Sequence, residues 1–484
     1  MANLRRSIVI NFFSSSGAAL LQFIVSIIIA RMLSPSEIGV FSMTVVFVNI
    51  AHIFRDFGVA TYLQREPELT NEKIRSAIGV LFTTSWTLAL VLVLASHWVG
   101  LWFKEPGIVP VMRVLAIGFL IIPFGSVTNS LLIREFAADK QAVITAVGTV
   151  SFCASCLLFA ALGQGAMSMA WANLVNIVVC ALVSIPYRPK GAPYLPSFRN
   201  WGVVVHFGAG TLATNCAGAI NSSLPDVLLG KLGSARMVGL FSRATSTVTM
   251  FFYAAGTTLT YGAVSYMSQA HQRGESLVPV IRRATALLTG VGWPALGLTA
   301  LLGRDVVLAL YGPNWLDCVP AMTPLGIAAA ALMVFHYTPT ALVAIGFPYL
   351  GAIPVVATMI ARIVFGIALY DGTLRTFAWA ICLATLVTIP VTVLQQRKYF
   401  NYGLRDLIRS LIPSAIVTAI CLVAGGVLEW MVPSSLAAIP RLAILGVPLA
   451  IVWYLALRLT GHEMLKEVDH LLVGFKNRLG RIAS

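Results

Sequence analysis

The chain has 484 residues, of which 58% are hydrophobic and only 11% are charged. A soluble protein carries about 25% charged residues, so this composition excludes a soluble enzyme, a disordered tail protein and a secreted disulfide scaffold. The net charge of +15 would indicate nucleic acid as a partner of a soluble chain. In a chain this apolar, the question is instead where the positive charges lie.

Apolar segments long enough to cross a bilayer, which takes about 20 residues, recur along the whole chain. The longest stretch between them runs from Arg188 to Trp201, so no soluble domain is expected. Arg5 and Arg6 precede an apolar run that is longer than the core of a signal peptide, which predicts a retained first helix. We predict an all-α polytopic membrane protein with about fourteen spans, at 7–30, 38–62, 76–101, 110–133, 141–162, 166–187, 203–229, 237–267, 281–303, 320–346, 349–370, 376–396, 408–430 and 440–460.

The basic residues are divided unequally between the two ends of these spans. Of the 33 Lys and Arg residues, 22 fall on the side of the N-terminus and eight on the opposite side, among them Arg441. Since Lys and Arg prefer cytoplasmic loops, both termini are expected in the cytoplasm. Three arginines, Arg55, Arg243 and Arg362, fall inside predicted spans.

An internal repeat relates the two halves of the chain. Residues 38–42 (IGVFS) match residues 238–242 (VGLFS) at an offset of 200, and Ser34 matches Ser234. A second match, at an offset of 210, pairs VPxMxxL at 109–115 with the same pattern at 319–325. Each half holds six helices, an even number, so the repeat is parallel and related by an axis along the membrane normal. Two such bundles are typical of an alternating-access transporter.

The repeat predicts how the chain is divided. The last segment mixes apolar and charged residues at helical spacing, which is compatible with a helix on the inner membrane face or with a solvated helix. We predict an N-terminal lobe at 1–188, a cytoplasmic linker at 189–202, a second six-helix lobe at 203–396, two additional helices at 397–460 and a cytoplasmic amphipathic tail at 461–484.

Three stretches of the sequence resemble the oligosaccharide-lipid flippases. They are ARMLSPSEIGVFSM at 30–43, FRDFGVATYLQRE at 54–66 and PDVLLGKLGSARMVGLFSRA at 225–244, and YGPNW at 311–315 is a weaker match. The chain is similar to the polysaccharide branch of the superfamily that also contains multidrug and toxin extruders, and within it to exporters of exopolysaccharide, colanic-acid-type or teichuronic-type units.

The resemblance implies a protein of the bacterial inner membrane that moves an undecaprenyl-pyrophosphate-linked oligosaccharide to the outer leaflet. Two lobes would rock around a central, often cationic cavity. Membrane lipids would surround the protein, and a polysaccharide polymerase and a chain-length regulator are candidate partners. No nucleic acid, cofactor, metal or catalytic residue is expected.

Ionisable residues inside spans are the first candidates for the transport site, because a charge in the bilayer centre costs at least about 2.5–3.5 kcal/mol. His52, Arg55 and Asp56 lie at spacings that bring them to one face of a helix. A guanidinium there suits bidentate contacts to pyrophosphate. The alternative is a structural clamp that pins this helix to a neighbour.

Asp226 and Arg243 fall at similar depth near the outer ends of two consecutive spans, which predicts a salt bridge. It would act as an outer gate or brace the helical hairpin. Arg362 has no charged neighbour in its span, so it should face the cavity or a carboxylate. It is a candidate for attracting an anionic substrate.

Neutral polar residues also concentrate in the first and seventh spans, which are equivalent in the repeat. Amides and hydroxyls suit hydrogen bonding to sugars, whereas small residues there would permit close helix packing. Asn11, Ser15 and Asn215 are the candidates for lining the cavity.

Two other function classes compete with the flippase. A drug or ion-coupled exporter of the same fold would have a hydrophobic cavity with carboxylates, whereas the spans here hold three arginines against two aspartates. A membrane-embedded polysaccharide polymerase or ligase would carry a large outer loop, which this sequence lacks.

Overall fold

The computed structural model describes residues 2–470 apart from residues 57, 67, 194, 199–200 and 261–262; the side chains of residues 2–13, 65, 203–215, 251–265 and 348 are also outside the description. All elements of the described chain are helices, as predicted. Twelve of the described helical segments are long and apolar enough to cross a membrane. The predicted span at 203–229 coincides with the helix Trp201–Leu232, whereas that at 237–267 overlaps two helices, Ala235–Thr260 and Ala263–Gln272. A total of fourteen spans stays a prediction.

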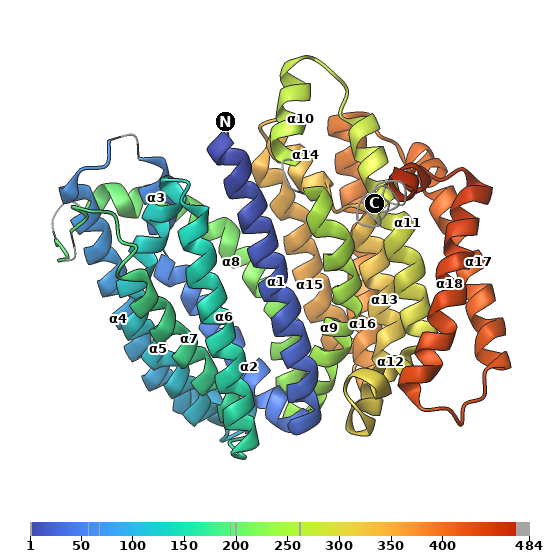
Figure 1. Ribbon diagram of the computed structural model, residues 1–484, viewed down its shortest axis with the longest axis horizontal. Helices are drawn as coiled ribbons and strands as arrows, with labels where there is room; N and C mark the ends of the chain where they lie inside the picture. Colours follow the sequence, from blue (N-terminus) through green and yellow to red (C-terminus); the bar gives the residue numbers. More distant parts are fainter. Residues whose placement is uncertain are drawn as a thin grey trace, which may run out of the picture. The chain divides into compact units, whose positions relative to one another are not determined.

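The helices form two compact units, Met1–Gly239 and Leu240–Ser484. In unit 1, α6 packs against α1 and α7, α5 packs against α4 and α7, and α8 packs against α2 and α4 (Figure 1). The division into repeat lobes joined at 189–202 stays a prediction. The elements of unit 1 are α1 (Ala2–Met32), α2 (Pro35–Asp56), α3 (Val59–Arg65), α4 (Asn71–Phe103), α5 (Ile108–Arg134), α6 (Ala138–Ala161), α7 (Met167–Ser184) and α8 (Trp201–Leu232).

Unit 2 begins within α9 (Ala235–Thr260) and is built around α11, which packs against both α13 and α17. The two additional helices after the second predicted lobe, α17 and α18, pack against each other. α16 packs against α13 and α15. The remaining elements are α10 (Ala263–Gln272), α11 (Val278–Leu301), α12 (Gly303–Leu310), η1 (Pro313–Cys318), α13 (Val319–Val334), α14 (Thr338–Ala344), η2 (Pro348–Gly351), α15 (Ala352–Ala368), α16 (Leu374–Phe400), α17 (Leu404–Met431) and α18 (Ala438–Thr460).

The second predicted span is not one continuous helix. α2 ends at Asp56, and α3 begins at Val59 after Gly58, whose φ of +69° lies in the left-handed region that glycine adopts without strain. Val59 therefore belongs to α3 and is buried against α4 and α5. This break leaves Arg55 and Asp56 in the last turn of α2.

The repeat motif occupies the same structural position twice. Ser34 precedes α2 and Ser234 precedes α9, and each serine hydroxyl accepts a backbone N–H three residues later, from Glu37 and Met237. Glu37 completes a capping box, because its carboxylate accepts the backbone N–H and the hydroxyl of Ser34 at 2.7 and 2.8 Å. Both helices therefore start from a side-chain cap at the repeated serine.

The end of α8 is held firmly within unit 1. The Lys231 ammonium donates to the Trp102 carbonyl at 2.9 Å and lies 5.1 Å from the centre of the Trp102 ring. Leu229 is fully buried, and a Cβ on Gly230 would come within 2.8 Å of the Phe103 ring. A side chain at residue 230 would therefore have to displace the Phe103 ring and Met43 Sδ, which would lie 2.6 Å from its Cβ.

The first part of the C-terminal tail packs against unit 2. Residues 464–470 are helical, and Met464, Leu465 and Val468 contact the cluster formed by α17 and α18. Arg283 of α11 forms an ion pair with Glu467 at 3.0 Å. The apolar side of this segment thus lies on protein, and the rest of the predicted tail lies outside the described residues.

Candidate functional site

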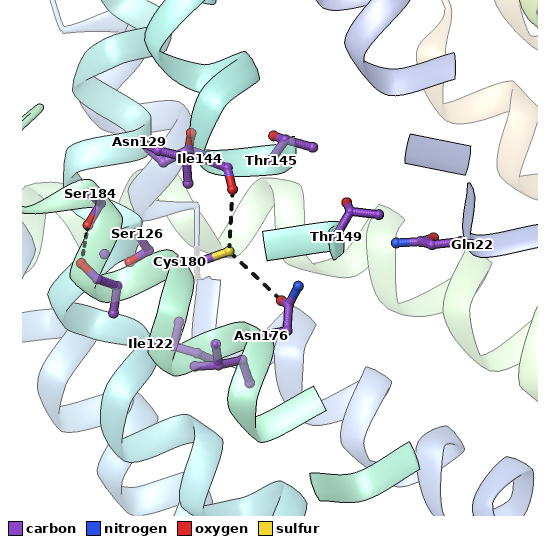
Figure 2. A pocket seen from close by; sticks show the side chains of 13 residues that line it. Gln22, Ile122, Ser126, Asn129, Ile144, Thr145, Thr149, Asn176, Cys180 and Ser184 are labelled. Carbon is purple, nitrogen blue, oxygen red and sulfur yellow. Dashed lines mark hydrogen bonds between the residues drawn. The ribbon is translucent and has the colours of Figure 1, made fainter. Parts of the chain in front are cut away.

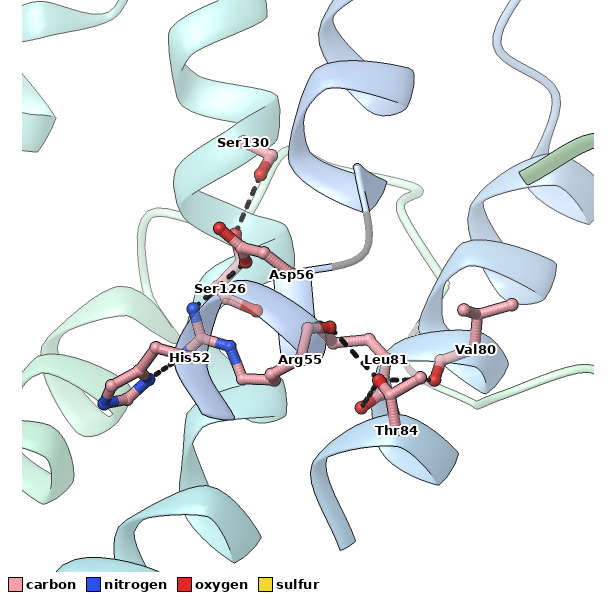
Figure 3. Close-up of polar contacts among 8 residues, drawn as sticks. All are labelled: His52, Arg55, Asp56, Val80, Leu81, Thr84, Ser126 and Ser130. Atoms are coloured by element: carbon pink, nitrogen blue, oxygen red, sulfur yellow. Dashed lines mark hydrogen bonds and ion pairs between the residues drawn. The ribbon is translucent and has the colours of Figure 1, made fainter. Parts of the chain in front are cut away.

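The three polar residues predicted to share a face of the second span do come together at the end of α2 (Figure 3). The Arg55 guanidinium lies 3.1 Å from His52 Nδ1 through one terminal nitrogen and 3.0 Å from Asp56 Oδ1 through the other. The Arg55 side chain is 14% exposed and that of Asp56 is 50% exposed. We call these three residues the charged trio.

Neighbouring helices fix the charged trio in place. The His52 ring stacks on Phe119 of α5, with ring centres 4.5 Å apart and planes 20° apart. The Thr84 hydroxyl of α4 lies 3.1 Å from the Arg55 carbonyl, one of the carbonyls left open where α2 ends, and shares its hydrogen with the Val80 carbonyl at 2.9 Å. The guanidinium is therefore held between an imidazole and a carboxylate before any ligand is present.

The pairing of Arg55 is incomplete. Its Nε is buried and has no hydrogen-bond partner among the described residues, and the carboxylate of Asp56 is half exposed. A buried donor without a partner costs roughly 1–3 kcal/mol. An anionic group that displaced Asp56 would meet a cation already taken out of water.

A second polar site, absent from the predicted residues, lies between α1, α5, α6 and α7 (Figure 2). It is a cavity of about 390 Å³ within unit 1, which we call the neutral cavity because its lining includes no charged side chain. The polar side chains that line it are Gln22, Ser126, Asn129, Thr145, Thr149, Asn176, Cys180 and Ser184.

Helical spacing delivers these side chains to one place. Thr145 and Thr149 are four residues apart on α6, and Asn176, Cys180 and Ser184 are spaced by four on α7. Residues at this spacing share a helix face. This period of polar residues in two consecutive spans is the signal by which the sequence could have revealed the cavity.

The neutral cavity extends from the middle of unit 1 towards the end at which the charged trio lies. Successive long helices run in opposite directions, so the last turns of α2, α5 and α7 meet the first turns of α4 and α6 at one end. Asp56 ends α2, and the cavity residues Asn129 and Ser184 lie in the last two turns of α5 and α7. Ser126 lines the cavity and is drawn among the residues around Arg55 (Figures 2 and 3). By the distribution of Lys and Arg, this end is the predicted cytoplasmic side.

Arg243, on α9 in unit 2, lies against aromatic rings. Its guanidinium carbon is 5.9 Å from the centre of the Tyr311 ring and 5.9 Å from that of Trp315, a distance at which a cation is attracted to a ring face. The Tyr311 hydroxyl is in turn 3.0 Å from Thr247 Oγ1. Asp226 belongs to unit 1, so its salt bridge with Arg243 stays a prediction.

The remaining predicted site residues are placed as follows. Arg362 lies partly buried in the middle of α15, and its role toward an anionic substrate stays a prediction. Ser15 is exposed on α1. The side chains of Asn11 and Asn215 lie outside the described residues.

Known proteins resemble this chain in sequence and in fold. The profile of the family described as "Polysaccharide biosynthesis protein" matches residues 28–320. Lipopolysaccharide biosynthesis protein WzxC of Escherichia coli (strain K12) is 20% identical over 61% of this chain, and the match spans only 60% of that relative. Teichuronic acid biosynthesis protein TuaB of Bacillus subtilis (strain 168) is 21% identical over 88% of this chain and 89% of its own length.

The fold is similar to that of a solved structure described as lipid II flippase MurJ in an inward closed conformation. The two share 11% identity with a TM-score of 0.73, over 93% of this chain and 99% of that one. At this identity the likeness concerns the fold alone. It agrees with the predicted all-α membrane architecture.

Proposed function

Because the chain belongs to the family of polysaccharide biosynthesis proteins, we propose that it flips undecaprenyl-pyrophosphate-linked oligosaccharides from the inner to the outer leaflet of the bacterial inner membrane. The names of WzxC and TuaB, which refer to the synthesis of surface polysaccharides, support this proposal. So does the chain's membrane fold, which it shares with a lipid II flippase. The mechanism is alternating access without a catalytic step.

One observation carries the proposal, namely the buried Arg55 guanidinium inside a span. Its partners are an imidazole and a half-exposed carboxylate, and its Nε is unsatisfied among the described residues. Intramembrane ionisable groups of this kind usually serve function. A pyrophosphate offers several anionic oxygens to a planar guanidinium, whereas a cationic drug would be repelled by it.

The placement of this group supports loading of the substrate from the cytoplasmic side. The charged trio lies at the end of unit 1 that the distribution of basic residues assigns to the cytoplasm. In this proposal both termini are cytoplasmic, and the substrate loads from the leaflet in which it is made. A polysaccharide polymerase and a chain-length regulator would act on the product at the outer face.

Deleting the gene in its native bacterium tests the proposal. We expect surface polysaccharide to be lost and undecaprenyl-linked repeat units to accumulate inside the cell. Re-expression of the full chain should reverse both effects. Intact polysaccharide together with increased drug sensitivity would contradict the proposal and favour the drug exporter.

A further inference from the structure

The neutral cavity combines polar and apolar groups inside a membrane-spanning bundle. Gln22 and Thr145 are exposed on their helices, and Thr149 is buried in the wall. None of these three side chains has an internal hydrogen-bond partner within the described part of the chain. Polar groups in hydrocarbon without a partner are costly. Their gathering at one cavity therefore indicates a polar occupant.

The amides of the cavity are positioned by the protein itself. Asn176 donates from Nδ2 to the Gly148 carbonyl at 2.7 Å, and its Oδ1 is 3.9 Å from the Cys180 thiol. A Cβ on Gly148 would lie 2.3 Å from the Cys180 sulfur and 3.2 Å from Asn176 Nδ2. The absence of a side chain at residue 148 thus lets α7 bring Asn176 to the cavity wall.

The chemistry of the lining restricts what can bind. Hydroxyl and amide groups offer both donors and acceptors, and Ile122, Ile144 and Ile177 add apolar surface. A sugar ring has hydroxyl groups at its edge and C–H groups on its faces, so it matches such a lining. The lining holds no Lys or Arg to neutralise a carboxylate, which makes an acidic sugar a poor occupant.

We propose that the neutral cavity binds an uncharged sugar residue of the lipid-linked oligosaccharide, while the charged trio on α2 binds its pyrophosphate. This assignment rests on the proposed flippase function. Ser126 lies in the cavity wall, and α5, which carries it, packs against α2. Its buried hydroxyl oxygen has no hydrogen-bond partner within the described residues. Sugar and pyrophosphate would thus be recognised on the two sides of α5.

Three near-isosteric substitutions test the assignment: Gln22→Met, Thr145→Val and Thr149→Val. Each removes hydrogen-bonding groups and keeps the side-chain volume. Ser151→Ala, on the same helix but outside the lining, is the matched control. The full-length protein in lipid nanodiscs would be titrated with three probes, which are bare undecaprenyl pyrophosphate and the same lipid carrying one glucose or one glucuronic acid.

We expect the wild-type protein and the control to bind the glucosyl probe at least about tenfold more tightly than the bare lipid. Two hydrogen bonds between the cavity and the glucose would account for this difference. The triple variant should bind the two probes equally, with its affinity for the bare lipid unchanged. Thr145→Val alone, at an exposed position, should show a partial loss even if the triple variant folds poorly.

Two results would overturn only the sugar assignment: an undiminished glucosyl preference in the triple variant and in Thr145→Val, or tighter wild-type binding of the glucuronosyl probe. If the wild-type protein bound none of the three lipids, the proposed function itself would fail, and the sugar assignment with it.

Discussion

Gly39 and Gly239 lie against each other's helices in a reciprocal contact. A Cβ on Gly39 would come within 1.7 Å of the Ala235 carbonyl oxygen, and a Cβ on Gly239 within 1.9 Å of the Pro35 carbonyl oxygen. The two glycines are equivalent in the repeat, 200 residues apart. The starts of α2 and α9 therefore cross at a distance that only two glycines permit.

Either Gly39→Ala or Gly239→Ala should force the starts of α2 and α9 apart. Because the clash is with backbone atoms, we expect each variant to be destabilised by about 2 kcal/mol or more, the size of a typical overpacking cost. We also expect a marked loss of export. The double variant should cost less than the sum, since one methyl already separates the helices. Thermal unfolding of the purified protein measures this coupling. Gly17→Ala, where nothing lies within 4 Å, is the control, and strict additivity would contradict the reciprocal contact.

Replacing Arg55 should impair export through loss of anion binding. We expect Arg55→Ala to lower the rate by about tenfold or more, and Arg55→Lys to restore it only in part, because an ammonium cannot hold His52 and Asp56 together with a phosphate oxygen. Arg362→Ala tests the second candidate cation. Flipping of a fluorescent lipid-linked oligosaccharide in proteoliposomes, at matched protein levels, gives the rates. Full export by both alanine variants would show that the cationic site has been assigned wrongly.

His462 makes the stability of unit 2 depend on pH. It follows the last span and is buried; its Nδ1 accepts the Met464 backbone N–H at 3.0 Å, and its Nε2 is 2.9 Å from the Ser414 hydroxyl. Burial lowers the pKa of His462 below its ordinary value, although Glu463 acts in the opposite direction. Burial therefore favours the neutral form of this imidazole in the folded protein.

Since the folded-state pKa of His462 lies below that of the unfolded chain, its contribution to stability is complete above the ordinary value of about 6.5 and declines as the pH falls below it. Thermal midpoints between pH 8 and pH 5 should decrease more steeply in the wild-type protein than in His462→Gln. His271→Gln, at an exposed position, is the control. Equal slopes in His462→Gln and the wild-type protein would disprove the contribution of His462.

A buried ion pair holds α18 to α12. Arg441 binds the Asp305 carboxylate and also donates to the Glu429 carbonyl at 3.3 Å, and Arg441 and Asp305 are each under a tenth exposed. Arg441→Leu should destabilise the protein by about 3–5 kcal/mol, because it leaves Asp305 buried without its partner. Adding Asp305→Leu should recover much of that loss. The measurement is the unfolding of both variants under identical detergent conditions; an unrecovered double variant would contradict the explanation.

The sequence predicted the helical spans because apolar runs of bilayer length need no tertiary information. It also brought His52, Arg55 and Asp56 together correctly, since their spacing lies within one helix. The partners of Arg243 and Arg441 could not be found in this way, because they are distant in the sequence. Tyr311 follows Arg243 by 68 residues, and Asp305 precedes Arg441 by 136 residues. Arg441, counted with the outer loop, is in fact buried in the first turn of α18.

The neutral cavity escaped prediction for a related reason. The four-residue spacing of polar residues marks one face of α6 and one face of α7, but only the packing of α6 against α1 and α7 joins these faces and Gln22 into one site. The break at Gly58 was also missed, because hydropathy continues across it from α2 into α3.

The glycine crossing is a two-fold type of contact made within a single chain. Reciprocal contact between equivalent residues is what two-fold symmetry imposes on a dimer of identical subunits, where one codon would have to serve both sides of the contact. In this chain the two sides of the contact are separate positions, residues 39 and 239. The two helix starts differ in their caps. Ser34 and Glu37 form a full capping box, whereas Met237 has no side-chain carboxylate to accept the backbone N–H of Ser234. The two glycines can therefore be replaced one at a time, so each side of the contact can be perturbed while the other is left as it is.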